Sequence, residues 1–271
     1  MYESYWQLDQ KPFENTADPQ FYFPAETHQA ALLKLRYAVE NRRGGVLLSG
    51  AAGTGKTFIL SMLREALGET YTPFIHLVYP QMEPAELLAY LADEFDGGGN
   101  AGFAVHESIR RIQGALRKNV EKGRHAVVVI DEAHLLENSR ILETLRMLLN
   151  FGPHGKSGMT LLLVGQPGIL PLLDRTPQLE ERLGVKCLLR PFTANETGQY
   201  TAHRLQVAGA TRPIVAADAV PTLFELTHGI ARQVNRLCDL ALLVGFAEEQ
   251  QTLSAAHFEA VCRELVAVVP E

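Results

Sequence analysis

Apolar positions along the chain follow two different periods, and the change between them divides the sequence. Up to about residue 192, short apolar runs alternate with segments in which apolar residues recur every three or four positions. The runs of strand length are 45–49, 72–78, 126–130, 159–164 and 185–189. This alternation predicts an α/β fold in which helices flank a parallel sheet.

The segments between these runs have helical periodicity, and the last part of the chain has nothing else. The helices predicted within the α/β part are 27–41, 58–67, 84–95, 105–122 and 138–150. From Thr193 onward the predicted helices are 195–207, 218–227, 230–246 and one capped by Ser254. We therefore expect an α/β domain over residues 1–192 and a small helical domain over residues 193–271.

Composition and charge narrow the class of protein. The 271 residues are 46% hydrophobic and 21% charged, which is typical of an ordered globular protein. A net charge of −6 argues against a broadly basic surface for nucleic acid. The three cysteines are far apart and lack metal-ligand spacing, so we expect reduced thiols. We find no signal peptide and no apolar run of membrane-spanning length, and expect a cytoplasmic protein.

A glycine-rich sequence joins the first predicted strand to the helix at 58–67. Residues 50–57 read GAAGTGKT, which fits the phosphate-loop pattern of Gly, four free positions, and Gly-Lys-Ser/Thr. The glycines let successive backbone N–H groups face one anion, and the helix start adds a positive dipole. The expected nucleotide-binding residues are Gly50, Ala51, Ala52, Gly53, Thr54, Gly55, Lys56, Thr57 and Phe58.

Two acidic residues follow the buried run at 126–130. Asp131 is expected to hold Mg²⁺ together with the Thr57 hydroxyl, and Glu132 to orient and polarise an attacking water. This is the Walker B arrangement. His134 is interpreted either as a satisfied interior histidine or as a relay to the γ-phosphate. Gln166, just after the run at 159–164, is a candidate for sensing the γ-phosphate or for holding the water; the alternative is a turn residue.

Three other features have two interpretations each. Arg182, before the last predicted strand, is either a surface charge or a residue that reaches a neighbour's nucleotide. The pair Arg42–Arg43 is either solvated or contacts an anion or a neighbouring subunit. The aromatic and proline-rich segment 5–24 should pack on the α/β domain, either covering a nucleotide base or simply filling space.

Together these motifs resemble an AAA+ ATPase, and the opening resembles the general secretion pathway protein A family. That family is related to ATPases of exosortase and pilus loci and to transposon target-selection ATPases. The residues that carry the second resemblance are Tyr5-Trp6-x-Leu8, Pro12-Phe13, Asp18-Pro19-x-Phe21, His28 and Ala31-Leu32. It extends from Tyr5 to about Val266.

The resemblance implies further roles. Gln166 would be sensor 1, where many AAA+ proteins have Asn or Thr, and Arg182 would be an arginine finger acting on a neighbouring subunit. Arg232, in the helical part, would be sensor 2 and contact the nucleotide; Ala231 stands before it where the family usually has Pro. The resemblance thus makes Glu132, Lys56, Gln166, Arg182 and Arg232 the catalytic residues.

The expected function is Mg²⁺-dependent ATP hydrolysis by a homo-oligomer that serves a secretion, pilus or exopolysaccharide assembly system. The alternative is a DNA-associated ATPase for transposition target selection. Secretion-pathway members commonly continue into a membrane span and a periplasmic region, whereas this sequence ends at Glu271. We therefore expect an excised cytoplasmic domain or a soluble member, with peripheral association at the inner membrane as the alternative location.

Overall fold

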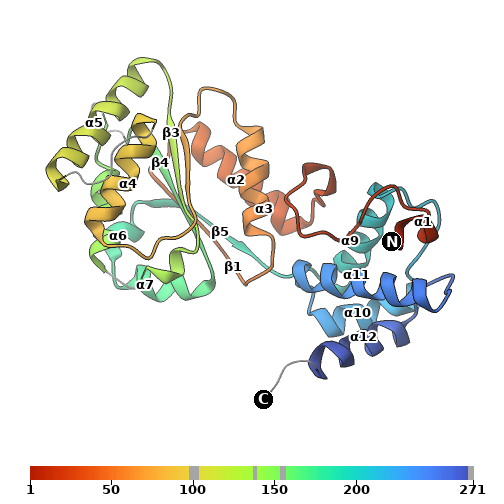
Figure 1. Ribbon diagram of the computed structural model, residues 1–271. Coiled ribbons are helices and arrows are strands. Elements are labelled where there is room, and N and C mark those ends of the chain that lie inside the picture. Colours follow the sequence, from red (N-terminus) through yellow and green to blue (C-terminus); the bar gives the residue numbers. More distant parts are fainter. Residues whose placement is uncertain (98–103, 137–138, 153–156, 268–271) are drawn as a thin grey trace. The chain divides into compact units, whose positions relative to one another are not determined.

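A computed structural model describes residues 1–97, 104–136, 139–152 and 157–267 (Figure 1). The predicted fold class is confirmed, because one parallel sheet has the strand order β2-β3-β4-β1-β5. The strands are β1 (Gly45–Gly50), β2 (Phe74–Leu77), β3 (Ala126–Ile130), β4 (Met159–Gly165) and β5 (Leu183–Leu189). Strands β1, β3 and β4 are buried along their whole length, which explains their continuous apolar sequences.

Helices cover both faces of this sheet (Figure 1). They are α2 (Glu26–Glu40), α3 (Lys56–Ala66), α4 (Pro84–Asp96), α5 (Val105–Glu121), α6 (Ser139–Leu148), α7 (Leu170–Asp174) and α8 (Pro177–Glu180). Alternate residues of the strands, such as Leu47, Val128 and Leu161, form one core with the apolar faces of α4, α5 and α6. The short helices α7 and α8 were not predicted from the sequence.

The strand order brings three loops to one edge of the sheet. Strand β1 pairs with β4 so that Ser49 lies opposite Gly165, and β4 pairs with β3 so that Leu163 lies opposite Ile130. All of these pairs are parallel, so the carboxyl ends of the three strands lie at the same edge. In open α/β sheets this edge is where ligands bind. The loops after β1, β3 and β4 carry the predicted site residues.

The second compact unit is helical and includes the amino-terminal segment. It comprises residues 1–26, 52–55 and 190–271. Its helices are α1 (Glu3–Trp6), α9 (Ala194–Val207), α10 (Val220–Thr227), α11 (Ala231–Ala247) and α12 (Ala255–Ala267). The sequence-based division at residue 192 assigned residues 1–26 to the α/β part instead. The predicted loop 96–102 lies mostly outside the described residues, as does the predicted start of a helix at 138.

Packing of the aromatic side chains explains where the amino-terminal segment lies. Trp6 is buried, and its indole Nε1 donates a hydrogen bond to the Leu242 carbonyl at 2.9 Å. The buried Arg204 guanidinium donates to the carbonyls of Pro12 and Glu14 and lies 4.3 Å from the centre of the Phe21 ring. These contacts favour space-filling over a base-covering role for the buried aromatic residues of the segment.

A buried histidine lies at the opposite, amino-terminal edge of the sheet. His125 is 1% exposed, and its Nε2 lies 2.9 Å from the Thr160 hydroxyl oxygen. That hydroxyl donates to the Arg43 carbonyl at 2.7 Å, so His125 must donate through Nε2–H. Burial, with a smaller contribution from the charge of Arg42, lowers the pKa of His125 to about 4.

This pKa predicts a loss of stability in mild acid. Between pH 6.5 and about pH 4 the unfolded chain binds a proton at His125 that the folded protein does not, so stability falls as the pH falls. From pH 7.5 to pH 4.5 the loss from this group should be about 2.5 kcal/mol. The measurement is urea unfolding of wild type and His125→Gln, whose amide still donates to Thr160. Equal pH dependence of the two proteins would contradict the prediction.

Candidate functional site

The phosphate loop leaves β1 and enters α3, as the sequence predicts. Gly53 and Gly55 have φ angles of +77° and +96°, which are left-handed conformations that L side chains rarely adopt. Lys56 is the first residue of α3, and Thr57, which follows it, is exposed. The loop therefore has the backbone conformations and the helix start that a phosphate-binding loop requires.

A close contact within the helical unit is a second reason why residue 53 must be glycine. The Arg232 backbone N–H donates to the Gly53 carbonyl at 3.1 Å. A Cβ atom at Gly53 would lie 2.9 Å from the Cβ of Arg232 and 3.0 Å from a methyl carbon of Ile230. Arg232 is the second residue of α11 and is exposed. The predicted sensor 2 residue thus contacts the phosphate loop through its backbone.

Lys56 is held against the loop that precedes it. Its side chain is buried, and Nζ donates to the carbonyls of Gly50 at 2.8 Å and Ala51 at 3.0 Å. These bonds hold the ammonium group at the carbonyl groups that begin the loop. An ammonium group and the backbone N–H groups of such a loop are both donors for a phosphate anion.

Asp131 is a buried carboxylate with two hydrogen-bond donors. The Glu132 backbone N–H donates to Oδ1 at 2.8 Å, and His76 Nε2 lies 3.3 Å from Oδ2. Burial raises the pKa of Asp131, but the bonds from His76 and Glu132 and the charge of Lys56 outweigh it and hold the pKa below its usual value. An ionised oxygen ligand at this position is suited to Mg²⁺.

His76 is a site residue that the sequence analysis missed. It lies on β2, beside β3, where His76 pairs with Val129. In the sequence, His76 is visible only as a polar residue within a predicted strand. That this strand lies beside β3, which ends directly before Asp131, is known only from the strand order. His76 is positioned to orient Asp131, because a hydrogen-bond donor to a metal-ligating carboxylate fixes the direction of its oxygens.

The contact makes a prediction about Mg²⁺. His76→Ala is expected to weaken the Mg²⁺-dependent part of nucleotide affinity about tenfold, because Asp131 loses an orienting donor. His76→Gln, whose amide nitrogen can replace Nε2, should retain most of it. Titration of a fluorescent ADP derivative with Mg²⁺ and with EDTA separates the Mg²⁺-dependent part of the affinity from the part that does not need Mg²⁺. An equal loss in both buffers would mean that His76 supports folding instead.

Glu132, His134 and Gln166 form a chain of contacts at the same edge. Glu132 has a φ of +50°, rare for a residue with a side chain, and its carboxylate is partly exposed. His134 Nδ1 lies 3.3 Å from Glu132 Oε2 and 3.4 Å from the Gln166 backbone nitrogen. The Gln166 side-chain nitrogen lies 3.0 Å from His134 Nε2. The structure thus joins the predicted base to the predicted sensor through His134.

Gly165 allows this approach of His134 to β4. A Cβ atom at Gly165 would lie 3.0 Å from the His134 backbone nitrogen and 3.4 Å from its Nδ1. Both distances are tighter than nearly all Cβ contacts, so a side chain here would displace the histidine. The need for glycine at this position was not predicted from the sequence.

Arg182 lies at the other edge of the sheet. It directly precedes β5, whose first residue Leu183 pairs with Gly45, the first residue of β1. The phosphate loop begins at the last residue of β1, so about 15–20 Å of strand separates it from Arg182. Arg182 is exposed. The structure therefore does not place it with the other predicted catalytic residues of the same chain.

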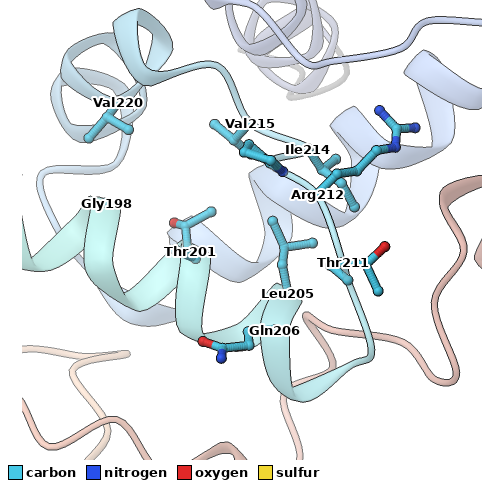
Figure 2. A pocket seen from close by; sticks show the side chains of 12 residues that line it. Gly198, Thr201, Leu205, Gln206, Thr211, Arg212, Ile214, Val215 and Val220 are labelled. Carbon is cyan, nitrogen blue, oxygen red and sulfur yellow. The ribbon is translucent and has the colours of Figure 1, made fainter.

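A separate pocket of about 410 Å³ lies within the helical unit (Figure 2). Residues of α9, including Thr201 and Leu205, form one wall, and the segment 210–215 and Val220 of α10 form another. None of its described lining residues is a predicted site residue. Its charged residue, Arg212, donates to the Gln251 carbonyl.

Comparison with known proteins agrees with this geometry. Residues 39–173 match the family model of an AAA domain. This span contains the phosphate loop, Asp131, Glu132 and Gln166. The chain contains an AAA domain and has the AAA+ P-loop fold. General secretion pathway protein A of Aeromonas hydrophila is 35% identical to this AAA+ protein over 251 residues. The match covers 91% of the chain and 45% of that relative, so the chain spans less than half of its length.

Solved structures show the same fold at low sequence identity. Cdc6p from Pyrobaculum aerophilum has a TM-score of 0.73 and 18% identity, and the match covers 97% of this chain and 75% of that one. The Aeropyrum pernix ORC2 protein, solved as ADPNP-ADP complexes, has a TM-score of 0.67 and 16% identity over 94% and 72% of the two chains. The AAA+ fold and the resemblance to general secretion pathway protein A are therefore confirmed. Among the described residues, no helix is long and apolar enough to cross a membrane.

Proposed function

We propose that this AAA+ protein hydrolyses ATP with Mg²⁺, oligomerises through its nucleotide site, and drives or times assembly of a secretion, pilus or exopolysaccharide system. The observation that carries the ATPase proposal is that the phosphate loop follows β1 and Asp131 and Glu132 follow β3, so that they lie at the carboxyl ends of the two strands that flank β4 in one parallel sheet. A phosphate held by the loop would lie beside a carboxylate able to act on water.

Each residue has a chemical role in the proposed reaction. Glu132 would accept a proton from a water molecule as its oxygen bonds to the γ-phosphorus. The bond from that phosphorus to the β–γ bridging oxygen breaks, which releases ADP and inorganic phosphate. Lys56 and the loop N–H groups would stabilise the negative charge that develops on the phosphate oxygens.

The donor set fits a magnesium ion that is shared with a nucleotide. Asp131 and the Thr57 hydroxyl provide two oxygen ligands, while the described residues contain no cluster of three or more acidic, histidine or cysteine ligands. Mg²⁺ usually takes its remaining ligands from phosphates and water. When bound, it would neutralise charge on the β- and γ-phosphates.

The place of Arg182 supports the oligomer. An exposed arginine on the edge away from its own phosphate loop is suited to the nucleotide of another subunit. Arg232, whose backbone contacts Gly53, is proposed as the sensor 2 arginine of the same chain. The assembly role itself rests on the similarity to general secretion pathway protein A.

The test is the mass of the protein in solution and its phosphate release, measured with Mg²⁺ and either ADP or a slowly hydrolysed ATP analogue. Each sample is prepared with and without duplex DNA. An ATP-dependent oligomer that is indifferent to DNA is the expected result. An oligomer that forms only with DNA would favour the alternative, target selection in transposition. A monomer in every sample would contradict the proposed oligomer, and absence of phosphate release would contradict the ATPase.

A further inference from the structure

His134 lies between the proposed base and the proposed γ-phosphate sensor, and it touches both through different nitrogens. We propose that His134 couples the orientation of the Gln166 side-chain amide to the availability of the Glu132 carboxylate, by exchange between its two neutral tautomers. The inference rests on the proposed function, in which Glu132 activates water, and on the sequence-based expectation that Gln166 senses the γ-phosphate. In this proposal His134 is a positioning residue, which acts on the reaction through Glu132 and Gln166.

In the first hydrogen-bonding pattern, His134 holds Glu132. Nδ1–H would donate to Glu132 Oε2, which lies 3.3 Å away, and the Nε2 lone pair would accept from the Gln166 amide nitrogen, which lies 3.0 Å away. A neutral imidazole has one N–H group and one lone pair, so this pattern uses both. The carbonyl oxygen of the Gln166 amide is then turned away from the histidine, and the carboxylate of Glu132 is engaged.

In the second pattern, His134 releases Glu132. The Nδ1 lone pair accepts from the Gln166 backbone N–H, 3.4 Å away, and the proton is on Nε2. Nε2–H cannot bond an amide NH₂ group, so the Gln166 side chain must turn to present its oxygen. Its NH₂ group then points away from His134. The two patterns differ in the position of one proton on the ring and in one amide rotation, with no change in charge.

The two patterns differ in how they receive a γ-phosphate. Phosphate oxygens only accept hydrogen bonds, so Gln166 can contact them through its NH₂ group but not through its carbonyl oxygen. The first pattern uses one N–H of the amide for His134, whereas the second leaves both N–H groups for the phosphate. A γ-phosphate at the end of β4 would therefore favour the second pattern, in which Glu132 is free to take a proton from water. ADP would leave the first pattern in place, with Glu132 held by His134.

The local backbone keeps the three side chains within reach of one another. Glu132 and His134 are separated by one residue, and the left-handed conformation of Glu132 begins the short 3₁₀ helix that carries His134. Gly165 lets that helix pack closely on β4, directly before Gln166. The His134 side chain is 16% exposed, which gives solvent access for exchange of the ring proton.

The decisive measurement is the tautomer of His134, read from the side-chain ¹⁵N resonances of histidine-labelled full-length protein by NMR. Spectra are recorded with Mg²⁺ and ADP and with Mg²⁺ and adenylyl imidodiphosphate, and the His134→Ala spectrum identifies the resonances. We expect the proton on Nδ1 with ADP and on Nε2 with the triphosphate analogue. The same tautomer in both complexes, or a doubly protonated ring in both, would overturn the proposed coupling through His134.

Measurements of ATP hydrolysis distinguish failure of the proposed coupling, called the relay below, from failure of the proposed ATPase function. His134→Asn and His134→Gln each place an amide near only one of the two ring nitrogens, so each should lower kcat about tenfold or more with little change in KM. His125→Gln, a change at a buried histidine on the other sheet edge, should leave kcat unchanged. If wild type hydrolyses ATP and both His134 variants match it, only the relay fails. If wild type does not hydrolyse ATP, the proposed function fails, and the NMR result alone decides the relay.

Discussion

Glu132→Gln is expected to lower kcat for ATP hydrolysis by about 10²- to 10⁴-fold, the range for losing a positioned base. The amide has the shape of the carboxylate but cannot accept a proton from water. Glu132 is partly exposed and its carboxylate faces His134, so the affinity for ATP should change little. The variant should therefore bind ATP and accumulate in the ATP-dependent oligomer.

The measurement combines phosphate release with mass in solution at saturating ATP. Glu143→Gln is a matched control, since Glu143 is an acidic residue of the α/β unit with 46% side-chain exposure, compared with 44% for Glu132. Glu143 pairs with Arg146 on α6 and is not a predicted site residue, so its replacement should leave kcat unchanged. Wild-type turnover in Glu132→Gln would refute the assignment of the base.

Arg182→Ala is expected to lower kcat about 10³-fold, the lower end for loss of an arginine finger. Because Arg182 lies at the edge away from its own phosphate loop, the defect should be repaired by another subunit. A mixture of Arg182→Ala with Lys56→Ala should therefore recover activity, at about a quarter of wild type if subunits pair at random in a head-to-tail interface.

Arg175→Ala, at the carboxyl end of α7 in the same connection, is the control and should hydrolyse ATP normally. Each of the two other variants should be inactive by itself. A mixture that stays as inactive as its components would argue against a role for Arg182 in a neighbour's site. Loss of the oligomer in Arg182→Ala would instead assign the arginine to subunit contact.

The elements that carry the site could be predicted because their signals are local. A strand, a glycine loop and a helix in succession define residues 45–66, and a buried run that ends in two acids defines 126–132. Parallel strands then require these loops to meet at one edge. The same reasoning predicted where Gln166 lies, since it follows another buried strand.

The remaining features depend on contacts between distant parts of the sequence. Aromatic residues such as Trp6 indicate burial, but they do not show which helices cover them. The contact of His76 with Asp131 requires the strand order, which the order of elements along the chain does not give. The left-handed conformation of Glu132 has no sequence signal, because glycine or asparagine is the usual residue there.

The separation of the phosphate loop and Arg182 on opposite ends of neighbouring strands has a consequence for stoichiometry. If every site needs a loop from one subunit and an arginine from the next, an open filament of n subunits contains n − 1 complete sites, and a closed ring contains n. Turnover per subunit would then rise with filament length toward a plateau, whereas in a ring it would be constant once the ring closes. The dependence of specific activity on protein concentration would therefore distinguish the two assemblies without an image of either.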